Sequence, residues 1–331
     1  MSIARTVWRW TLLLSGTAIL AGLASRLGAG PFVDGITVVD GHAILAAALI
    51  TLFTTVCSAW RWRLVARGLG IDLPLRAAVS AYYRSQFLNS VLPGGVLGDV
   101  HRGVDHGLSS GDIGRGLRAV VWERVGGQIV QFALAVTLLV LLPSPVHSSM
   151  PLVAAMVAVV AVLAVIVLRS RSACGTSILA RALSTSASDV GRGLLARNAW
   201  PGVVLASTGA MAGHTAIFLI AARAAGVSMP PERLLPLALL VLLAMSVPAN
   251  IAGWGPREGA AAWAFGAAGL GASQGVTVAV AYGVLAFVAC LPGAAILGLG
   301  WLRHHRGGVR SVDSVRIPQQ SVVDEGNVAR G

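Results

Sequence analysis

The sequence of 331 residues contains no lysine, only three cysteines and few charged side chains of any kind. Charged residues make up 11% of the chain, less than half of the share that a soluble domain usually carries. Hydrophobic residues make up 56%, and the mean hydropathy is +0.77. This balance excludes a soluble enzyme and predicts an integral membrane protein. All 25 basic residues are arginine, and the formal net charge is +12.

The sequence lacks the residue patterns of several common metal-binding, nucleotide-binding and catalytic sites. The cysteines are far apart, at Cys57, Cys174 and Cys290, so no metal-type spacing exists. The run "GGVLGD" has no lysine after it and therefore is not a phosphate-binding loop. His101, Asp105 and His106 have metal-binding side chains, but no second group elsewhere completes a site. No nucleophile motif predicts a hydrolase. We therefore expect no metal and no cofactor.

Six apolar runs are long enough for a helix to cross a bilayer: 10–28, 43–60, 119–142, 150–168, 200–222 and 276–301. Two further apolar regions, 77–104 and 234–274, are interrupted by proline and glycine. The pattern predicts an all-α polytopic membrane protein with about six full spans and two broken or re-entrant helical hairpins. Such a chain forms an eight-helix type of bundle.

Arginines lie at one set of span ends. They precede 10–28 and 119–142, follow 43–60 and 276–301, and recur in the serine-rich link 169–199. The loop "PSPVHSS" on the opposite side has none. The positive-inside rule then predicts a cell-membrane protein with both termini in the cytoplasm. Loop arginines of this kind favour anionic membrane lipids as partners, and not nucleic acid. We expect one membrane domain over 1–302 and a disordered cytoplasmic tail over 303–331.

The two interrupted regions predict an internal repeat. Three pairs lie 155 residues apart: Pro93 and Pro248, Gly98 and Gly253, Arg102 and Arg257. With the charge pattern, region 77–104 enters from the cytoplasm. Region 234–274 enters from the outside, unless it crosses twice. The halves 10–142 and 150–301 are then predicted to be an inverted-topology repeat, an arrangement typical of transporters.

Charged side chains inside membrane segments are costly and often functional. The candidates for binding a lipid phosphate or headgroup are Arg84, Asn89, Asp99, Arg102, Glu123, Arg257 and Glu258. The predicted helix breaks that shape their cavity are Pro93, Gly94, Gly95, Gly98, Pro248, Gly253 and Gly255. A cavity lined by guanidinium groups and helix N-termini suits an anionic group. The alternative is that Arg84 and Arg102 reach the interface and that Glu123 pairs with Arg118 or Arg124.

Four stretches carry a resemblance: "WRWRLVARGLG", "RSQFLNSVLPGGVLGDVHRG", "WERVGG" and "VPANIAGWGPREGA". Together they resemble the membrane domain of the lysylphosphatidylglycerol synthases, which includes the flippase half of the multiple peptide resistance factor. The resemblance covers about residues 10–302. It implies movement of a lipid between leaflets. Pro256 departs from the family pattern, although it leaves Arg257 and Glu258 in place.

In full-length relatives a soluble C-terminal domain transfers the amino acid from charged tRNA. We expect this chain to be a stand-alone form without that domain and without transferase activity. The leading hypothesis is a flippase-like transporter. Its cargo would be an anionic or aminoacylated phospholipid, or a polyprenyl-phosphate-linked glycolipid. The alternatives are an accessory subunit of a separately encoded aminoacyl- or glycosyl-transferase, and a structural envelope scaffold.

Overall fold

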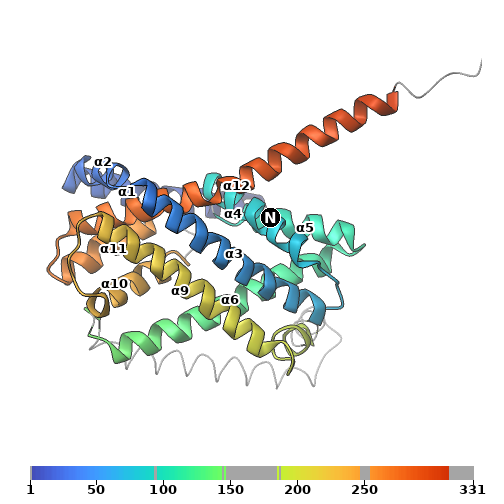
Figure 1. Ribbon diagram of the computed structural model, residues 1–331, viewed down its shortest axis with the longest axis horizontal. Helices are drawn as coiled ribbons and strands as arrows, with labels where there is room; N and C mark the ends of the chain where they lie inside the picture. Colours follow the sequence, from blue (N-terminus) through green and yellow to red (C-terminus); the bar gives the residue numbers. More distant parts are fainter. Residues whose placement is uncertain are drawn as a thin grey trace, which may run out of the picture.

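The computed structural model describes residues 2–92, 95–143, 145–146, 185, 188–246 and 254–312, without the side chains of 2–13, 15 and 303–312. The regular elements of this part are all helices (Figure 1). They are α1 (Ser2–Leu27), α2 (Gly30–Thr37), α3 (Gly41–Gly68), α4 (Leu75–Val91), α5 (Leu97–Ser109), α6 (Ile113–Leu141), the π-helix η2 (Val190–Leu194), α9 (Trp200–Ala224), α10 (Pro231–Ala244), α11 (Pro256–Ala267) and α12 (Ala272–Val312). The predicted all-α class is confirmed.

Four of these helices, α3, α6, α9 and α12, are long and apolar enough to cross a membrane. They correspond to the predicted spans 43–60, 119–142, 200–222 and 276–301, so the chain is a multi-pass membrane protein. The predicted span 10–28 lies within α1, whose described apolar part is the shorter Gly16–Leu27. The predicted span 150–168 lies outside the described residues. No helix was predicted between the spans 10–28 and 43–60, where the structure has α2.

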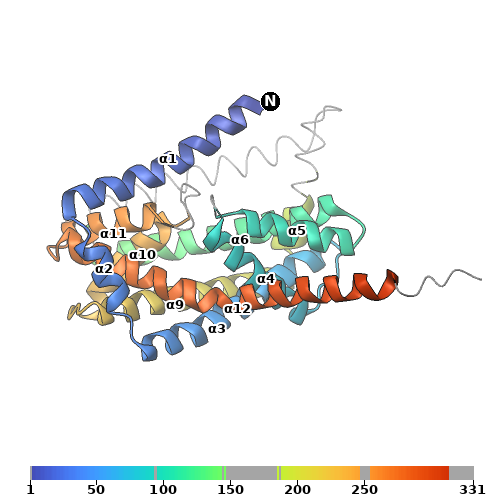
Figure 2. The same ribbon diagram turned by 90° about the horizontal axis from the view of Figure 1, so that it is seen from above.

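Helices α4 and α5 form a hairpin that begins and ends at the same end of the bundle. The chain enters it from the C-terminal end of α3 and leaves it into the N-terminal end of α6. These two ends lie together, because Arg61 of α3 contacts Glu123 of α6. Helices α10 and α11 form a second hairpin, which lies at the other end of the bundle (Figures 1 and 2).

The turns that lead into the two hairpins share their backbone geometry. Before α4, the N–H of Ile71 donates to the carbonyl of Ala66, and Gly70 has a φ of 78°. Before α10, the N–H of Val227 donates to the carbonyl of Ala222, and Gly226 has a φ of 77°. Pro74 and Pro230 then cap the helices with similar extended dihedral angles. Each feature recurs after 156 residues.

The tips of the two hairpins differ in length. The first joins α4 to α5 through 92–96, and the second joins α10 to α11 through the longer 245–255. Arg102 therefore lies in the second turn of α5, whereas Arg257 lies in the first turn of α11. Of the three 155-residue pairs, this one alone has both members among the described residues.

The core lies where α9, α10, α11 and α12 pack around the first half of α3. Its largest members are aromatic, and Phe218 contacts both Phe265 and Tyr282. Helices α3 and α9 lie side by side (Figure 1). Gly213 of α9 faces Thr54 of α3 so closely that a Cβ there would overlap the threonine methyl group. Small residues thus permit the close helix packing that is typical of membrane bundles.

Candidate functional site

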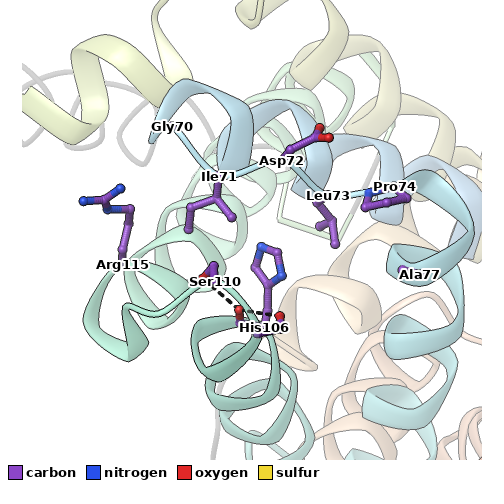
Figure 3. A pocket seen from close by; sticks show the side chains of 10 residues that line it. Gly70, Ile71, Asp72, Leu73, Pro74, Ala77, His106, Ser110 and Arg115 are labelled. Atoms are coloured by element: carbon purple, nitrogen blue, oxygen red, sulfur yellow. Dashed lines mark hydrogen bonds between the residues drawn. The ribbon is translucent and has the colours of Figure 1, made fainter.

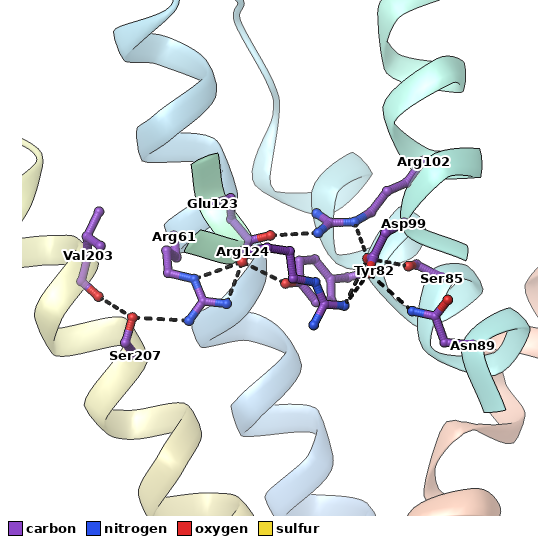
Figure 4. Close-up of polar contacts among 10 residues, drawn as sticks. All are labelled: Arg61, Tyr82, Ser85, Asn89, Asp99, Arg102, Glu123, Arg124, Val203 and Ser207. Atoms are coloured by element: carbon purple, nitrogen blue, oxygen red, sulfur yellow. Dashed lines mark hydrogen bonds and ion pairs between the residues drawn. The ribbon is translucent and has the colours of Figure 1, made fainter. Parts of the chain in front are cut away.

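Five charged side chains from three helices meet inside the bundle, and we call them the ion-pair cluster (Figure 4). They are Arg61 of α3, Asp99 and Arg102 of α5, and Glu123 and Arg124 of α6. All except Arg124 are buried. Buried charges are stable only when they are paired and hydrogen-bonded, so the cluster must be satisfied from within.

Glu123 is the first centre of the cluster. Its Oε1 accepts hydrogen bonds from Nε of Arg61 at 2.8 Å and from the hydroxyl of Tyr82 at 2.8 Å. Its Oε2 accepts from Nη2 of Arg102 at 2.6 Å. Nη2 of Arg61 contacts Oε1 as well. The carboxylate is fully enclosed, and two guanidinium groups and one phenol share its negative charge.

Asp99 is the second centre. Its Oδ1 accepts from Nε of Arg102 and from the hydroxyl of Ser85, each at 3.0 Å. Nη2 of Arg124 lies 2.8 Å from Oδ2. The amide of Asn89 donates to Oδ2 at 3.3 Å, and its oxygen accepts from the N–H of Gly98 at 2.8 Å. Asp99 also lies in the first turn of α5, where the helix dipole favours a negative charge.

Arg102 joins the two centres and is enclosed by aromatic rings. Its guanidinium carbon lies 4.6 Å from the ring centre of Trp62 and 4.2 Å from that of Tyr82. Nη1 of Arg102 is buried and has no hydrogen-bond partner among the described residues. The two rings stabilise the cation through their faces, which compensates in part for the missing partner.

The cluster carries an excess of positive charge. Its three guanidinium groups face two carboxylates, which leaves a formal charge of +1. The side chain of Arg124 is 45% exposed, whereas those of Arg61 and Asp99 are 8% and 12% exposed. The excess charge is therefore accessible at Arg124. In the part of the chain that the structure describes, Arg124 bonds only to Asp99, through Nη2, so its other N–H groups could donate to an anion.

A second, smaller site lies at the start of α11. Nε of Arg257 donates to Oε1 of Glu258 at 2.8 Å, and its guanidinium lies 4.7 Å from the ring centre of Trp254. The other carboxylate oxygen of Glu258 accepts from the N–H of Gly255 at 2.7 Å. Gly255 has a φ of 113° and lies so close to Gly16 of α1 that a Cβ would be 2.9 Å from its Cα. Only glycine fits this helix start.

Helix α9 connects the two sites. The hydroxyl of Ser207 accepts from Nη1 of Arg61 at 3.1 Å, which links α9 to the ion-pair cluster. Nδ1 of His214 lies 3.3 Å from the hydroxyl of Tyr282, whose ring faces Arg257. Ser207 and His214 are two helical turns apart, about 10 Å along the helix axis. Polar groups thus occur at two levels along one face of α9.

The structure brings together four of the seven predicted headgroup residues: Asn89, Asp99, Arg102 and Glu123. Arg257 and Glu258 form the second site. Arg84 belongs to neither, because its Nη2 contacts Asp105 at 2.9 Å. The alternative pairing of Glu123 is wrong, because Arg118 contacts Asp189 and Arg124 contacts Asp99.

The helix breaks are described in part. Gly98 is buried against Ser85, where a Cβ would lie 2.8 Å from the Ser85 carbonyl carbon. Gly95 and Gly255 lie at hairpin tips with positive φ angles. Pro93, Gly94, Pro248 and Gly253 lie outside the described residues.

Sequence reasoning missed several members of the site: Arg61, Trp62, Tyr82, Ser85 and Ser207. The sequence places Arg61 among the loop arginines that follow a span, where such a side chain usually faces water. The structure buries it against Gly127 of α6, where a Cβ would lie 2.7 Å from the Arg61 guanidinium carbon. The motif "WERVGG" contains both Glu123 and this glycine, but no local pattern connects it with residue 61.

A cavity of about 290 Å³ lies at the end of the bundle where α4 begins (Figure 3). It is lined by 70–74, Ala77, His106, Ser109, Ser110 and Arg115. Nε2 of His106 is buried without a partner among the described residues, and burial lowers the pKa of this histidine. Its ring centre lies 5.3 Å from that of Trp62. The same Trp62 ring also contacts Arg102, so it links His106 with the ion-pair cluster.

No three His, Cys, Asp or Glu side chains in the described ranges are placed to hold a metal ion together. Among the described residues, the geometry offers a buried charge network in which the Arg124 side chain is 45% exposed, inside a bundle of bilayer-length helices.

A helical bundle of this kind, with paired charges in its interior, is characteristic of multi-pass membrane proteins that handle polar or charged ligands. The family model "Lysylphosphatidylglycerol synthase TM region" matches residues 8–293, so the chain belongs to this family. Membership indicates a function connected with membrane lipids. No curated protein matches the chain. No solved structure matches it either.

Proposed function

We propose that this protein moves a phosphate-bearing lipid between the two leaflets of the cell membrane. The lipid phosphate binds at the ion-pair cluster. The observation that carries the proposal is the charge imbalance, since three guanidinium groups face two carboxylates and the Arg124 side chain is 45% exposed. Arginine binds phosphate through two parallel hydrogen bonds, and such bonds strengthen in a water-poor interior.

Asp99 is the proposed switch of this site. In the structure it occupies Nη2 of Arg124, with contacts of 2.8 and 2.9 Å to its two oxygens. An incoming phosphate replaces this carboxylate at Arg124. Asp99 then keeps its bonds to Ser85 and Arg102, so neither charge is left unpaired. Glu123 holds Arg61 and Arg102 in place throughout. The Arg257–Glu258 pair is the proposed second binding site for the lipid phosphate as the lipid crosses the membrane.

The repeated turns support a transport mechanism. Two hairpins at opposite ends of a bundle, each preceded by the same turn 156 residues apart, fit an inverted-topology repeat. In such repeats, the substrate lies where broken helices meet, and one half moves against the other. We propose that α4–α5 re-enters the membrane from the cytoplasm and α10–α11 from the outside. Both termini are then cytoplasmic.

The cargo belongs to the lipids whose phosphate is an anion. These are anionic phospholipids, their aminoacylated forms and polyprenyl-phosphate-linked glycolipids. The site recognises the shared phosphate, whereas the rest of the headgroup extends beyond the described cluster.

The experiment is a leaflet-specific assay in proteoliposomes. Vesicles contain fluorescently labelled phosphatidylglycerol, and dithionite quenches the label in the outer leaflet. Wild-type protein exposes the inner-leaflet label, and Arg102→Ala, Arg124→Ala and Arg257→Ala lower the rate about tenfold or more. Arg84→Ala is the matched control, because Arg84 lies outside both sites. Equal rates in all folded variants would contradict the proposed site.

Two other outcomes address the alternatives. A purified protein that moves none of the three lipid classes is no transporter. If a separately encoded transferase co-purifies with it and needs it for activity, the accessory-subunit hypothesis replaces the proposal. If no transferase depends on the protein, but envelope assembly fails without it, the scaffold hypothesis replaces the proposal.

A further inference from the structure

Helix α6 carries polar side chains at three positions that face the same way. Arg124, Gln128 and Gln131 are spaced by four and three residues, so they form one stripe about 10 Å long. Arg124 and Gln128 are exposed, and Gln131 is half-buried. This stripe occupies the middle of a helix that is long and apolar enough to span a membrane.

Gln128 stands out among the four bilayer-length helices. It is exposed, and it makes no hydrogen bond with the described part of the chain. In the central parts of α3, α9 and α12 every exposed residue is apolar, such as Leu49, Leu205 and Phe287. An amide that faces hydrocarbon without a partner costs several kcal/mol. The position therefore faces water or a polar ligand.

The two ends of the stripe contact the two hairpins. At one end Arg124 contacts Asp99, which lies just after the tip of the first hairpin. At the other end the amide of Gln131 donates to the carbonyl of Leu242 at 3.1 Å and to the hydroxyl of Ser246 at 3.4 Å. Leu242 lies just before the tip of the second hairpin, and Ser246 lies at the start of that tip. Gln128 lies between these two contacts.

From this placement we infer that Gln128 is a headgroup-binding residue at the midpoint of the path. Its amide replaces water around the lipid phosphate and hydroxyl groups as they pass from one hairpin tip to the other. The inference rests on the proposed function and adds the specific surface that the headgroup follows. That surface is the stripe of Arg124, Gln128 and Gln131, while the acyl chains remain in the surrounding lipid.

The first test measures water access and does not depend on transport. Gln128→Cys is made in a background with Cys57, Cys174 and Cys290 replaced by alanine, and is treated with a charged, membrane-impermeant thiol reagent. We expect fast labelling. Ile129→Cys is the matched control, because Ile129 is also exposed but lies about 100° around the helix axis from Gln128. It should react at least about tenfold more slowly in the bilayer.

The second test measures transport. Gln128→Leu keeps the size of the side chain and removes its hydrogen-bonding groups, so the protein should be as thermostable as wild type or more so. We expect its rate of phosphatidylglycerol movement to fall about tenfold. Gln128→Asn should retain most of the rate. Ile129→Leu, on the same helix, should leave the rate unchanged.

The outcomes separate the two proposals. A wild-type protein that moves no lipid contradicts the proposed function, while fast labelling at position 128 still supports a water-lined stripe. Slow labelling at 128, or wild-type transport by a folded Gln128→Leu protein, overturns the inference. Efficient disulfide-linked dimers of Gln128→Cys would also overturn it, because they would show an interface between two copies.

Discussion

Nη2 of Arg102 lies 2.6 Å from Oε2 of Glu123, and neither side chain has any exposed surface. An ion pair this deep contributes little net stability, because desolvation offsets the attraction between the charges. Its members nevertheless depend on each other. Removing one leaves the other charged and enclosed, which costs about 3–5 kcal/mol. A buried pair that adds so little to stability is consistent with the ligand-binding role proposed above.

Glu123→Gln should therefore destabilise the protein by about 3 kcal/mol or more, since Arg61 and Arg102 would share a neutral amide. The measurement is thermal unfolding in detergent, with Asp105→Asn as a control for loss of a carboxylate that is half exposed. The control should change stability by no more than about 1 kcal/mol. Equal unfolding temperatures for the two variants would show that Glu123 is not the centre of a coupled network.

In each of the two sites, a glycine without a side chain leaves space for a buried guanidinium group. A Cβ on Gly127 would lie 2.7 Å from the guanidinium carbon of Arg61, and a Cβ on Gly283 would lie 2.7 Å from that of Arg257. Both guanidinium groups are paired and buried, so they cannot move without breaking ion pairs. Gly127→Ala and Gly283→Ala should each destabilise the protein by about 1–3 kcal/mol.

Gly298→Ala is the matched control for these variants. It lies in α12, and a Cβ at this position would have no atom of the described residues within 4 Å apart from the backbone of its own helix. Alanine there should be neutral or stabilising, because it favours the helix by up to about 1 kcal/mol. If alanine is tolerated equally at all three positions, the guanidinium groups have more room than their contacts indicate.

Features of the fold that depend on neighbouring residues can be predicted from the sequence, whereas contacts between distant segments cannot. Apolar length is local, and it predicts α3, α6, α9 and α12. Proline and glycine near residue 95 predict the break between α4 and α5. The partners of Asp99 and Glu123 are not local. Arg61 reaches Glu123 across 62 residues, and its burial depends on the absence of a side chain at Gly127. Judged only from its position directly after the predicted span 43–60, Arg61 is therefore expected to be exposed, whereas the structure buries it.

The cavity histidine should make stability depend on pH. Burial lowers the pKa of His106 below histidine's ordinary value of about 6.5, although Asp105 acts in the opposite direction. As the pH falls below that value, the unfolded chain binds a proton that the folded protein does not take up. The stabilisation by neutral His106 is thus complete above about pH 6.5 and decreases below it.

The check is a comparison of wild type with His106→Asn at pH 7.5 and pH 5.5. Wild type should lose more thermal stability between the two values than His106→Asn does. His101, which is exposed on the same helix, gives the control variant His101→Asn. If wild type and His106→Asn lose the same thermal stability between the two pH values, burial does not lower the pKa of His106.

The last prediction concerns orientation in the membrane, on which the proposed transport mechanism depends. Ser273 and Asp105 are both exposed and lie near opposite ends of the bundle, at the start of α12 and near the end of α5. In a cysteine-free background, Ser273→Cys should react with an impermeant reagent applied to intact cells. Asp105→Cys should react only after the membrane is opened. Because the two hairpins begin from these two ends, labelling of both positions from one side would rule out their entry from opposite faces. Without that opposition, the ion-pair cluster would lie on one side of the membrane, and its excess charge would bind lipid phosphate from one leaflet alone.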